Sequence, residues 1–297
     1  MSRQRISPAT TIIGAGRVGS ALAHLLHRKG YPIVSVISRG HRSARALARG
    51  VRSPIASTRL ADIDPDSTLI VLAVPEPAIA SVAGDLAALS ILRPGRLTVV
   101  HTAGALTSDV LSPLVAVGAR GFSLHPIQTF PLHGPITRQL ESMKGIWYGF
   151  EGPRGVRPFA RSLVKDLGGR MVEVPKDRKN LYHIACVFAS NYPMVLVSVL
   201  ETLGATLGMK GLDPFKPLLQ SSIRNSQEFG AIPALTGPLV RGSLDILERH
   251  VEELSARDQA ILGVYTALGL YAVTVLRAEG RISEEQASRM ASILKNP

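Results

Sequence analysis

Three glycines near the N-terminus stand at a spacing that can hold phosphate groups. They belong to a G-x-G-x-x-G pattern that consists of Gly14, Ala15, Gly16, Arg17, Val18 and Gly19. The first glycine of such a pattern permits a tight turn, the second lets backbone N–H groups approach a pyrophosphate, and the third lets a helix pack closely on a strand. The apolar run before the pattern and the Ala- and Leu-rich segment after it predict a strand and a helix whose N-terminus faces the phosphates. The motif therefore predicts dinucleotide binding.

Arginines replace the acidic residue that NAD-binding chains usually carry about 20 residues beyond these glycines, where a carboxylate holds the ribose 2′-hydroxyl. The second predicted strand ends at Ser38 and Arg39, and no carboxylate occurs over residues 40–61. Guanidinium groups match phosphate oxygens, so we expect Ser38, Arg39 and Arg42 to bind the 2′-phosphate of NADP(H). Arg45, Arg49 and Arg52 follow at intervals of three or four residues, which would place a row of arginines along a predicted helix. For these three, exposure on a solvated helix face is an equal alternative to phosphate binding.

Two histidines, His101 and His125, come at the ends of later strand-like runs, and a histidine can donate or accept a proton. Ligands of open parallel sheets bind beyond the carboxyl ends of the strands. Val74 and Pro75 leave the predicted sheet at the same edge and are expected to border the cofactor. We therefore predict His125 and His101 as candidate catalytic residues, with a structural role as the alternative for each.

A long predicted helix in the second half of the chain carries three further polar candidates. Lys179 and His183 are four residues apart and share a helix face, whereas Asn191 lies about 80° around the helix from His183. Pro193 lies inside the same predicted helix and is expected to kink it. A kinked helix with polar groups can border a cleft, so Lys179, His183 and Asn191 are candidate catalytic residues. The alternative is that the first two are solvent-exposed and that Asn191 caps the kink.

The order of predicted elements indicates an α/β domain followed by an all-α domain. Strand-like runs alternate with helical or loop segments at residues 10–13, 33–38, 68–74, 97–102 and 119–124. This alternation predicts a parallel, doubly wound Rossmann sheet, which two strands at 146–150 and 170–174 extend around a helix at 156–167. Helical patterns follow at 177–207, 213–229, 239–253, 256–278 and 284–294. We predict a Rossmann domain at 1–175 and a helical domain at 176–297.

Composition limits the classes of protein to which the chain can belong. The 297 residues, 45% of them hydrophobic, can bury a large core. The net charge of +12 is spread along the chain and aromatic residues make up 5%, so no base-stacking platform indicates nucleic-acid binding. Cys186 is the single cysteine, which excludes an intrachain disulfide and a cysteine-based metal site and fits a reducing cytoplasm.

Two segments bear on targeting and membranes. Residues 1–8 are polar, so no signal peptide is expected. The apolar segment 260–276 barely reaches spanning length and contains small residues that permit close packing, so we interpret it as a buried or subunit-interface helix rather than a membrane span. A cytoplasmic protein without a membrane partner is expected.

Several motifs together resemble the Rossmann-like proteins with a C-terminal helical domain of unassigned function. The resemblance covers nearly the whole chain and is carried by segments 14–19, 74–76, 101–104, 121–126, 181–183, 188–192 and 234–242. That group belongs to the 6-phosphogluconate dehydrogenase-like superfamily, with pyrroline-5-carboxylate reductase, deazaflavin-dependent NADP reductase and β-hydroxyacid dehydrogenases. The resemblance implies NADP binding and a homodimer formed through the helical domain, and some members are associated with ketopantoate reduction. Ser243 departs from the acidic residue that the group carries after Arg241-Gly242.

The pair His125-Pro126 is also similar to the His-Pro pair of prephenate dehydrogenases, whose histidine receives the proton of the substrate hydroxyl. A glycine expected soon after the pair is missing from residues 127–129, so the resemblance implies a role for His125 alone, as a candidate acid or base. A proton donor with a pKa near neutrality suits this role. Lys179, His183 and Arg241 are candidates for binding a substrate carboxylate.

These observations combine into one principal expectation and two alternatives. The principal one is an NADPH-dependent oxidoreductase that reduces a small carbonyl or imine acid, such as a 2-oxo acid of the ketopantoate type, without a metal. One alternative is a non-catalytic NADP(H)-binding regulatory or scaffold protein, and the other is oxidation of the prephenate dehydrogenase kind. Strand-end histidines and a polar helix need not accompany mere binding, so they favour the enzyme.

Overall fold

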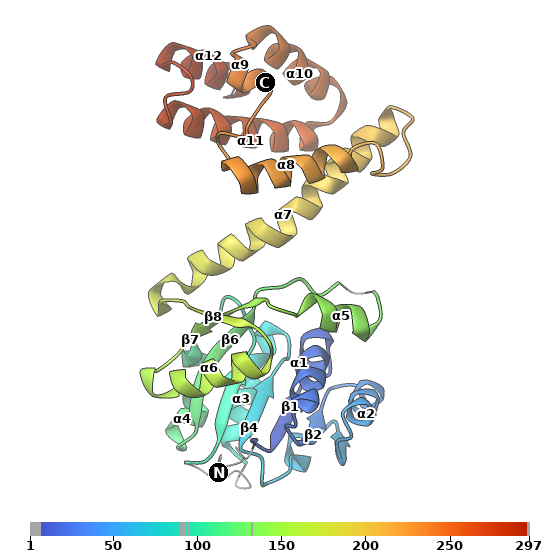
Figure 1. The fold of residues 1–297 in the computed structure, drawn as a ribbon, viewed down its shortest axis with the longest axis vertical. Coiled ribbons are helices and arrows are strands. Elements are labelled where there is room, and N and C mark those ends of the chain that lie inside the picture. The colour runs from blue at the N-terminus through green and yellow to red at the C-terminus, as the bar shows by residue number, and fades with distance from the viewer. Residues whose placement is uncertain (1–6, 90–92, 94, 132, 296–297) are drawn as a thin grey trace. The chain divides into compact units, whose positions relative to one another are not determined.

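The computed structural model describes residues 7–89, 93, 95–131 and 133–295 (Figure 1). Contacts between Cα atoms divide the chain into two compact units, residues 1–192 and 193–297. The division lies between Tyr192 and Pro193, inside helix α7 (Lys179–Thr206). Contacts thus group the first half of α7 with the sheet, while the domain boundary at residue 175, placed where strands give way to helices, stays a prediction.

Within the described residues, the first unit is built on one eight-stranded sheet with the order β3-β2-β1-β4-β5-β6-β7-β8. The strands are β1 (Thr10–Ile13), β2 (Ile33–Ile37), β3 (Ile55–Ser57), β4 (Leu69–Leu72), β5 (Thr98–His101), β6 (Arg120–Pro126), β7 (Trp147–Glu151) and β8 (Arg170–Glu173). Neighbouring strands from β3 to β6 are parallel, β7 is antiparallel to β6, and β8 is parallel to β7. The strand order reverses at β1, which is where open α/β sheets bind ligands.

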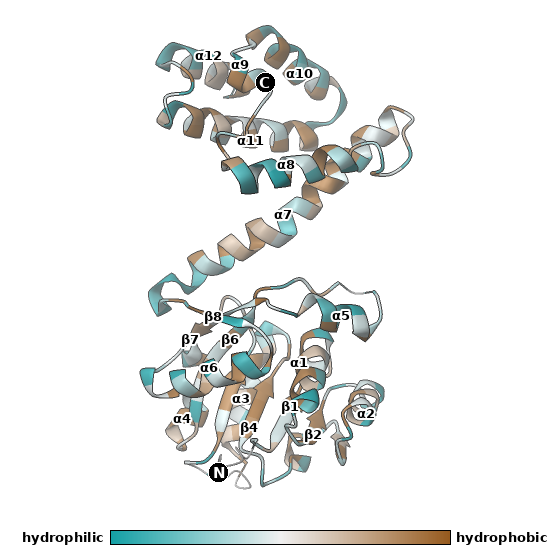
Figure 2. Cartoon of the chain, in the orientation of Figure 1, coloured by the Kyte–Doolittle hydropathy of each residue, from teal (hydrophilic) through white to brown (hydrophobic). Residues whose placement is uncertain are grey.

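Apolar residues cover both faces of this sheet, and Figure 2 shows hydrophobic colouring along strands such as β1 and β4. Alternation along each strand sends Ile12 and Val71 to one hydrophobic core and Ile13 and Leu72 to the other. The first core is covered by α1 (Arg17–Arg28), α2 (His41–Gly50), α5 (Ile136–Ser142) and α6 (Arg157–Asp166). The second is covered by α3 (Ile79–Ala87) and α4 (Ser112–Ala116). The predicted doubly wound α/β fold is therefore confirmed.

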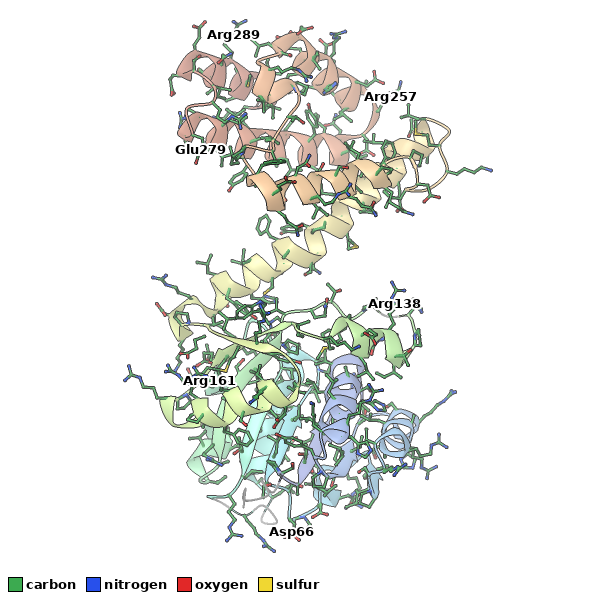
Figure 3. All side chains as sticks on the ribbon, viewed as in Figure 1. Asp66, Arg138, Arg161, Arg257, Glu279 and Arg289 are labelled. Carbon is green, nitrogen blue, oxygen red and sulfur yellow. The ribbon has the colours of Figure 1, made fainter. Side chains whose placement is uncertain are left out.

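Short 3-10 helices lead into several of these elements. They are η1 (Leu60–Asp62), η2 (Glu76–Ala78), η3 (Ser108–Leu111), η4 (Arg154–Val156) and η5 (Lys176–Arg178). Long charged side chains such as Arg138 on α5 and Arg161 on α6 extend from the surface of the unit (Figure 3). Exposed ion pairs of this kind, for example Arg161 with Glu173 at 3.7 Å, contribute little to stability.

The sheet differs from the sequence-based expectation in two respects. Strand β3 (Ile55–Ser57) was not predicted, because three residues are too few to show a strand period. The seven predicted strands are present, but β7 runs antiparallel to β6, so the sheet is mixed rather than wholly parallel. The apolar pattern of a strand carries no information on its direction, which its pairing partner decides.

The second unit is helical throughout its regular structure, and it packs around its own hydrophobic core. After the end of α7, its helices are α8 (Lys216–Phe229), α9 (Pro238–Arg241), α10 (Leu244–Arg257), α11 (Gln259–Ala278) and α12 (Glu284–Lys295). The helix predicted at 239–253 is broken by Gly242, whose φ of 72° is left-handed. Asp258 caps α11 by accepting hydrogen bonds from the N–H groups of Ala260 and Ile261, both at 2.9 Å.

Two described helical segments, Lys176–Thr206 and Gln259–Ala278, are long and apolar enough to cross a membrane. Length and composition are weak evidence by themselves, because core and interface helices pass the same test. Of the apolar window in Gln259–Ala278, 28% is buried, and none of the window in Lys176–Thr206 is.

Candidate functional site

The glycine turn has the geometry that its sequence predicts. Gly14 follows β1 with a φ of +105°, and a Cβ atom there would collide with the carbonyl of Ala73. A Cβ at Gly19 would collide with the carbonyl of Gly14, so α1 and β1 pack at a distance that only glycine allows. Gly16 is the N-cap residue of α1, and no atom lies within 4 Å of the Cβ position there. The turn thus leaves an open face at a helix N-terminus, which is suited to a pyrophosphate.

A cavity of about 530 Å³ opens beside this turn at the carboxyl ends of the strands, on both sides of the reversal point. Its lining includes Gly14, Ala15, Gly16, Ser38, Arg39, Ser43, Val74 and Pro75. The Arg39 guanidinium is exposed and has no hydrogen bond or ion pair with another described residue. Ser38 Oγ lies 3.2 Å from Ser43 Oγ, which adds a hydroxyl that sequence reasoning did not select.

The remaining predicted cofactor residues lie around this cavity in different ways. Arg42 lines a separate hollow of about 770 Å³ on α2, together with Arg45, Arg49 and Arg52. Arg17 lines a third hollow, of about 380 Å³, on the other side of the glycine turn. Val18 is partly buried against the hydrophobic core and lines none of these three cavities. The geometry therefore favours Arg39 over Arg42 as the direct phosphate ligand.

A second group of polar side chains comes from strand β6 and the start of α7. Ser123 and His125 are two residues apart on β6 and share one face of the sheet. The Lys179 ammonium donates a hydrogen bond to Ser123 Oγ at 2.9 Å, and His125 Nδ1 lies 2.7 Å from the Tyr182 hydroxyl. Lys179 Nζ also lies 5.3 Å from the centre of the Tyr182 ring. One strand and one helix turn thus bring four polar groups together.

Lys179 is the charged member of this group. Its side chain is 2% exposed, and burial lowers its pKa to about 8, although the Glu151 carboxylate opposes that shift. Glu151 is itself buried and accepts hydrogen bonds from the N–H and hydroxyl groups of Ser108. A buried cation without a directly bonded carboxylate is costly, and such groups occur preferentially where charge develops in a reaction.

His125 lies half-buried beside positively charged and polar neighbours. Burial, followed by the nearby Lys179 and His183, lowers the pKa of His125 to about 4. The imidazole is therefore neutral at pH 7, with a pKa below the near-neutral value that best suits an acid or base. A neutral imidazole can still polarise a carbonyl by donating a hydrogen bond.

His101 lies inside the sheet and lines neither the cavity beside the glycine turn nor the cavity against His125. It is fully buried, its Nδ1 accepts a hydrogen bond from the Ala103 N–H at 3.3 Å, and its Nε2 lies 3.2 Å from the Thr107 carbonyl. Burial lowers its pKa to about 4, so this ring is neutral with both nitrogens occupied. The predicted catalytic role of His101 is untested, but the geometry favours a structural one, in which the ring holds the loop after β5.

A cavity of about 270 Å³ lies against His125, and α7 supplies its other wall. The lining residues include Gln128, His183, Cys186, Ser190 and Asn191. Asn191 Oδ1 accepts a hydrogen bond from the Ser190 hydroxyl at 2.8 Å. His125, His183 and Asn191 therefore border one cavity, although the turn of about 80° between the last two left a different surface open for Asn191, and Lys179 is not among the lining residues.

Gly104 lets the two histidines approach the loop after β5. A Cβ atom there would lie 2.6 Å from His183 Cδ2 and 3.2 Å from His125 Nε2. Sequence reasoning missed Ser123 and Tyr182, although a signal was present. Ser123 alternates with His125 along one strand, and Tyr182 is three residues from Lys179 on one helix. Among the described residues, no group of three or more metal-binding side chains gathers.

Comparisons with known proteins were consistent with this geometry. Residues 2–126 match the Rossmann-like domain family, and residues 146–272 match a domain of unknown function, DUF2520. A candidate NADP oxidoreductase from Bacteroides fragilis is 25% identical, with a TM-score of 0.74 over 90% of this chain and 98% of its own. No curated protein matches the sequence.

Two further solved structures share the fold at lower identity. A reductive aminase from Aspergillus terreus, in complex with NADPH and ethyl levulinate, is 16% identical, with a TM-score of 0.68 over 97% of this chain and 99% of its own. Prephenate dehydrogenase from Aquifex aeolicus is 17% identical, with a TM-score of 0.52 over 91% of this chain and 99% of its own.

Proposed function

We propose that this chain, a Rossmann-like domain joined to a DUF2520 domain, is an NADP(H)-dependent oxidoreductase that reduces a small carbonyl or imine compound. One observation carries the proposal: the glycine turn with its cavity and the His125 cavity both lie at the carboxyl edge of the same sheet. That edge is where a dinucleotide lies along an open α/β sheet, so cofactor and substrate have adjoining sites on one unit.

NADP(H) is preferred over NAD(H) because of the charge beside the cavity. Arg39 and the hydroxyls of Ser38 and Ser43 stand where a carboxylate would accept the ribose hydroxyl of NAD, and no acidic residue lines the cavity. The fold-sharing reductive aminase is a complex with NADPH, and the protein that is 25% identical is described as a candidate NADP oxidoreductase. The backbone of Gly14, Ala15 and Gly16 would hold the pyrophosphate.

The polar group behind the second cavity fits the demands of reduction. NADPH, once bound, would supply a hydride and become NADP+, and the carbonyl oxygen or imine nitrogen would carry the resulting negative charge or basicity until it takes up one proton from solvent. The Lys179 ammonium, with a pKa lowered to about 8, supplies positive charge at neutral pH, and His125 borders the cavity as a hydrogen-bond donor. Both residues therefore stabilise the product side of the reaction.

The substrate class follows from the cavity size and lining. A volume of about 270 Å³ suits a small molecule, and His183 and Asn191 offer polar contacts to a carboxylate or carbonyl. A 2-oxo acid of the ketopantoate type, or an imine of similar size, is our proposed substrate. Oxidation of the prephenate dehydrogenase kind is the second candidate, because His125-Pro126 ends β6 as a strand-end His-Pro pair.

The test joins a binding and a turnover measurement. A thermal-shift titration with NADPH and NADH is followed by a panel of 2-oxo acids, cyclic imines and prephenate, monitored for cofactor oxidation or reduction. We expect stabilisation by NADPH above NADH and turnover of a 2-oxo acid or imine. Stabilisation without any turnover would favour the non-catalytic NADP(H)-binding alternative, and absence of stabilisation by either nucleotide would overturn the cofactor assignment.

We also propose that the protein is a cytoplasmic homodimer formed through its helical part. Large apolar side chains remain exposed on the helices of the second unit, including Leu218 and Ile223 on α8 and Leu268 and Tyr271 on α11. Exposed apolar surface of this extent is typical of a subunit interface. A second copy of the chain would cover the apolar stretches of α7 and α11 without a membrane.

A further inference from the structure

Tyr182 is the residue of this site that the proposed function does not yet use. Its hydroxyl lies 2.7 Å from His125 Nδ1, and the two rings meet edge to face, with centroids 5.7 Å apart and an interplanar angle of 87°. The tyrosine comes from the first turn of α7 and the histidine from the end of β6. The contact therefore ties the orientation of the imidazole to the helix that forms the opposite wall of the cavity.

The direction of this hydrogen bond follows from the chemistry of its two partners. Burial is the main cause that raises the pKa of Tyr182, so its hydroxyl keeps its single hydrogen at neutral pH. A phenol is a better donor than acceptor, and an unprotonated imidazole nitrogen is a strong acceptor. The hydroxyl hydrogen is therefore directed to His125 Nδ1, 2.7 Å away.

The other side of the imidazole is open. Among the described residues, Nε2 of His125 has no hydrogen-bond partner, and it is not among the buried polar atoms left without one. Gly104 lies beside this nitrogen and has no side chain, whereas a Cβ atom at that position would lie 3.2 Å from Nε2. Nε2 is thus accessible from the cavity that His125 lines.

In the part of the chain that the structure describes, the charged and titratable groups near His125 are Lys179, His183, His101, Tyr182 and Cys186, and no carboxylate is among the causes that shift its pKa. Positive neighbours oppose a second proton on the ring. A neutral imidazole whose Nδ1 accepts a hydrogen bond carries its one hydrogen on Nε2.

We propose that Tyr182 is a positioning residue that fixes His125 as the Nε2–H tautomer, so that a neutral imidazole donates a hydrogen bond to the substrate oxygen or nitrogen. This inference rests on the proposed function for its catalytic consequence. It excludes the usual picture of an imidazolium that releases a proton near neutral pH, and it assigns His125 the stabilisation of developing charge.

The experiment reads the tautomer directly. The full-length protein is labelled with ¹⁵N in its histidines, and His125 is assigned from the resonances lost in His125→Gln. At pH 7 we expect Nδ1 of His125 at the chemical shift of an unprotonated nitrogen and Nε2 at that of a protonated one. The reverse assignment, or an imidazolium, in the wild-type protein would overturn the proposal without any variant of Tyr182.

The variant Tyr182→Phe removes only the hydroxyl. We expect the His125 resonances to move toward a mixture of tautomers and kcat/KM to fall about 10- to 100-fold, with the Kd for NADPH unchanged. Tyr192→Phe is the matched control, because this tyrosine is on the same helix, is 47% exposed and packs on Phe188 instead. An unchanged tautomer in Tyr182→Phe would refute the positioning role. Absence of NADPH binding or turnover would refute the proposed function and leave the tautomer measurement valid.

Discussion

At the scale of single residues, the proposed preference for NADP(H) is assigned to the Arg39 guanidinium, which has no hydrogen bond or ion pair with another described residue. Arg39 lines the cavity beside the glycine turn, and Arg49, on the same surface, lines the neighbouring hollow on α2. A comparison of variants at the two arginines therefore distinguishes a direct ligand of the 2′-phosphate from a general positive potential, which weakens with distance and with salt concentration.

Arg39→Asp is expected to raise the Kd for NADPH about 10- to 100-fold, because a charge-assisted hydrogen bond to the 2′-phosphate is lost, and not to raise the Kd for NADH, because the new carboxylate can accept the ribose hydroxyl. Isothermal titration calorimetry with both nucleotides measures the effect. Arg49→Asp makes the same change in charge and should alter either Kd less than about threefold. Equal losses in the two variants would show that net charge, not Arg39, selects the cofactor.

Lys179 gives the proposed reaction a characteristic pH dependence. Its pKa is lowered to about 8 by burial, so the ammonium form is present below that pH and is lost as the pH rises through it. We expect kcat to be highest below pH 8 and to fall above it, and Lys179→Met to lower kcat at least about 100-fold and remove this limb. Lys176→Met, which changes an exposed lysine paired with Asp109, is the control and should keep the wild-type profile.

At the scale of elements, two glycines of the phosphate-binding turn have different expected roles: Gly14 in the stability of the fold and Gly16 in nucleotide binding. Gly14 has a left-handed φ and no room for a Cβ atom, whereas Gly16 has an ordinary φ and open space. The same Gly→Ala change is therefore expected to strain the backbone at position 14 and to be accommodated by the fold at position 16.

Gly14→Ala is expected to lower the free energy of unfolding by about 1–3 kcal/mol, because the backbone is strained and the methyl group collides with the end of β4. Gly16→Ala should leave that free energy within about 0.5 kcal/mol and weaken NADPH binding, since its methyl group occupies the pyrophosphate face. Urea denaturation and nucleotide titration of both variants measure the two quantities. Loss of stability in Gly16→Ala, with normal NADPH binding, would contradict the assignment.

Strand β5 carries a buried histidine that links folding to pH. The pKa of His101 is lowered to about 4, whereas the unfolded chain titrates near 6.5, so the unfolded state binds more protons between those values. The free energy of unfolding should therefore fall with decreasing pH over this window, by at most about 1.4 kcal/mol per pH unit from this residue. His101→Gln should flatten the slope in thermal denaturation, and the exposed His133→Gln should not.

At the scale of the whole molecule, the exposed apolar surface of the helical unit is the basis for the proposed homodimer. Leu218 and Ile223 on α8 are 68% and 60% exposed, although each is a large apolar side chain. A second copy of the chain is our proposed partner, so the assembly is expected to be a dimer in solution.

Replacing Leu218 and Ile223 by Glu is expected to shift the protein from dimer to monomer, because charge is costly to bury in an interface. Sedimentation equilibrium measures the change, with Gln220→Glu as a control that adds charge to the same helix without removing an apolar group. A monomeric wild-type protein would refute the dimer, and association with detergent micelles instead would favour a membrane role for α7 and α11.

The sequence by itself determined the features whose signals are local in the chain. The strand, glycine turn and helix at residues 10–28 were predictable from the glycine spacing and the apolar pattern. The expected preference for NADP(H) came from the arginines after β2 and the absence of any carboxylate over residues 40–61. The alternation of elements likewise predicted the doubly wound sheet, because the period of apolar residues reports burial on one or both faces.

The tertiary structure decided everything that depends on which distant residues meet. It brought Ser123 and Tyr182 into the site, moved His101 away from the cavity and Arg42 into a separate hollow, and reversed β7. It also lowered the pKa of His125 to about 4, because desolvation and the charge of Lys179 arise only when β6 and α7 pack together. Residue types fix which chemistry is possible, whereas burial and neighbouring charge, which no linear spacing specifies, select the protonation states that the site presents.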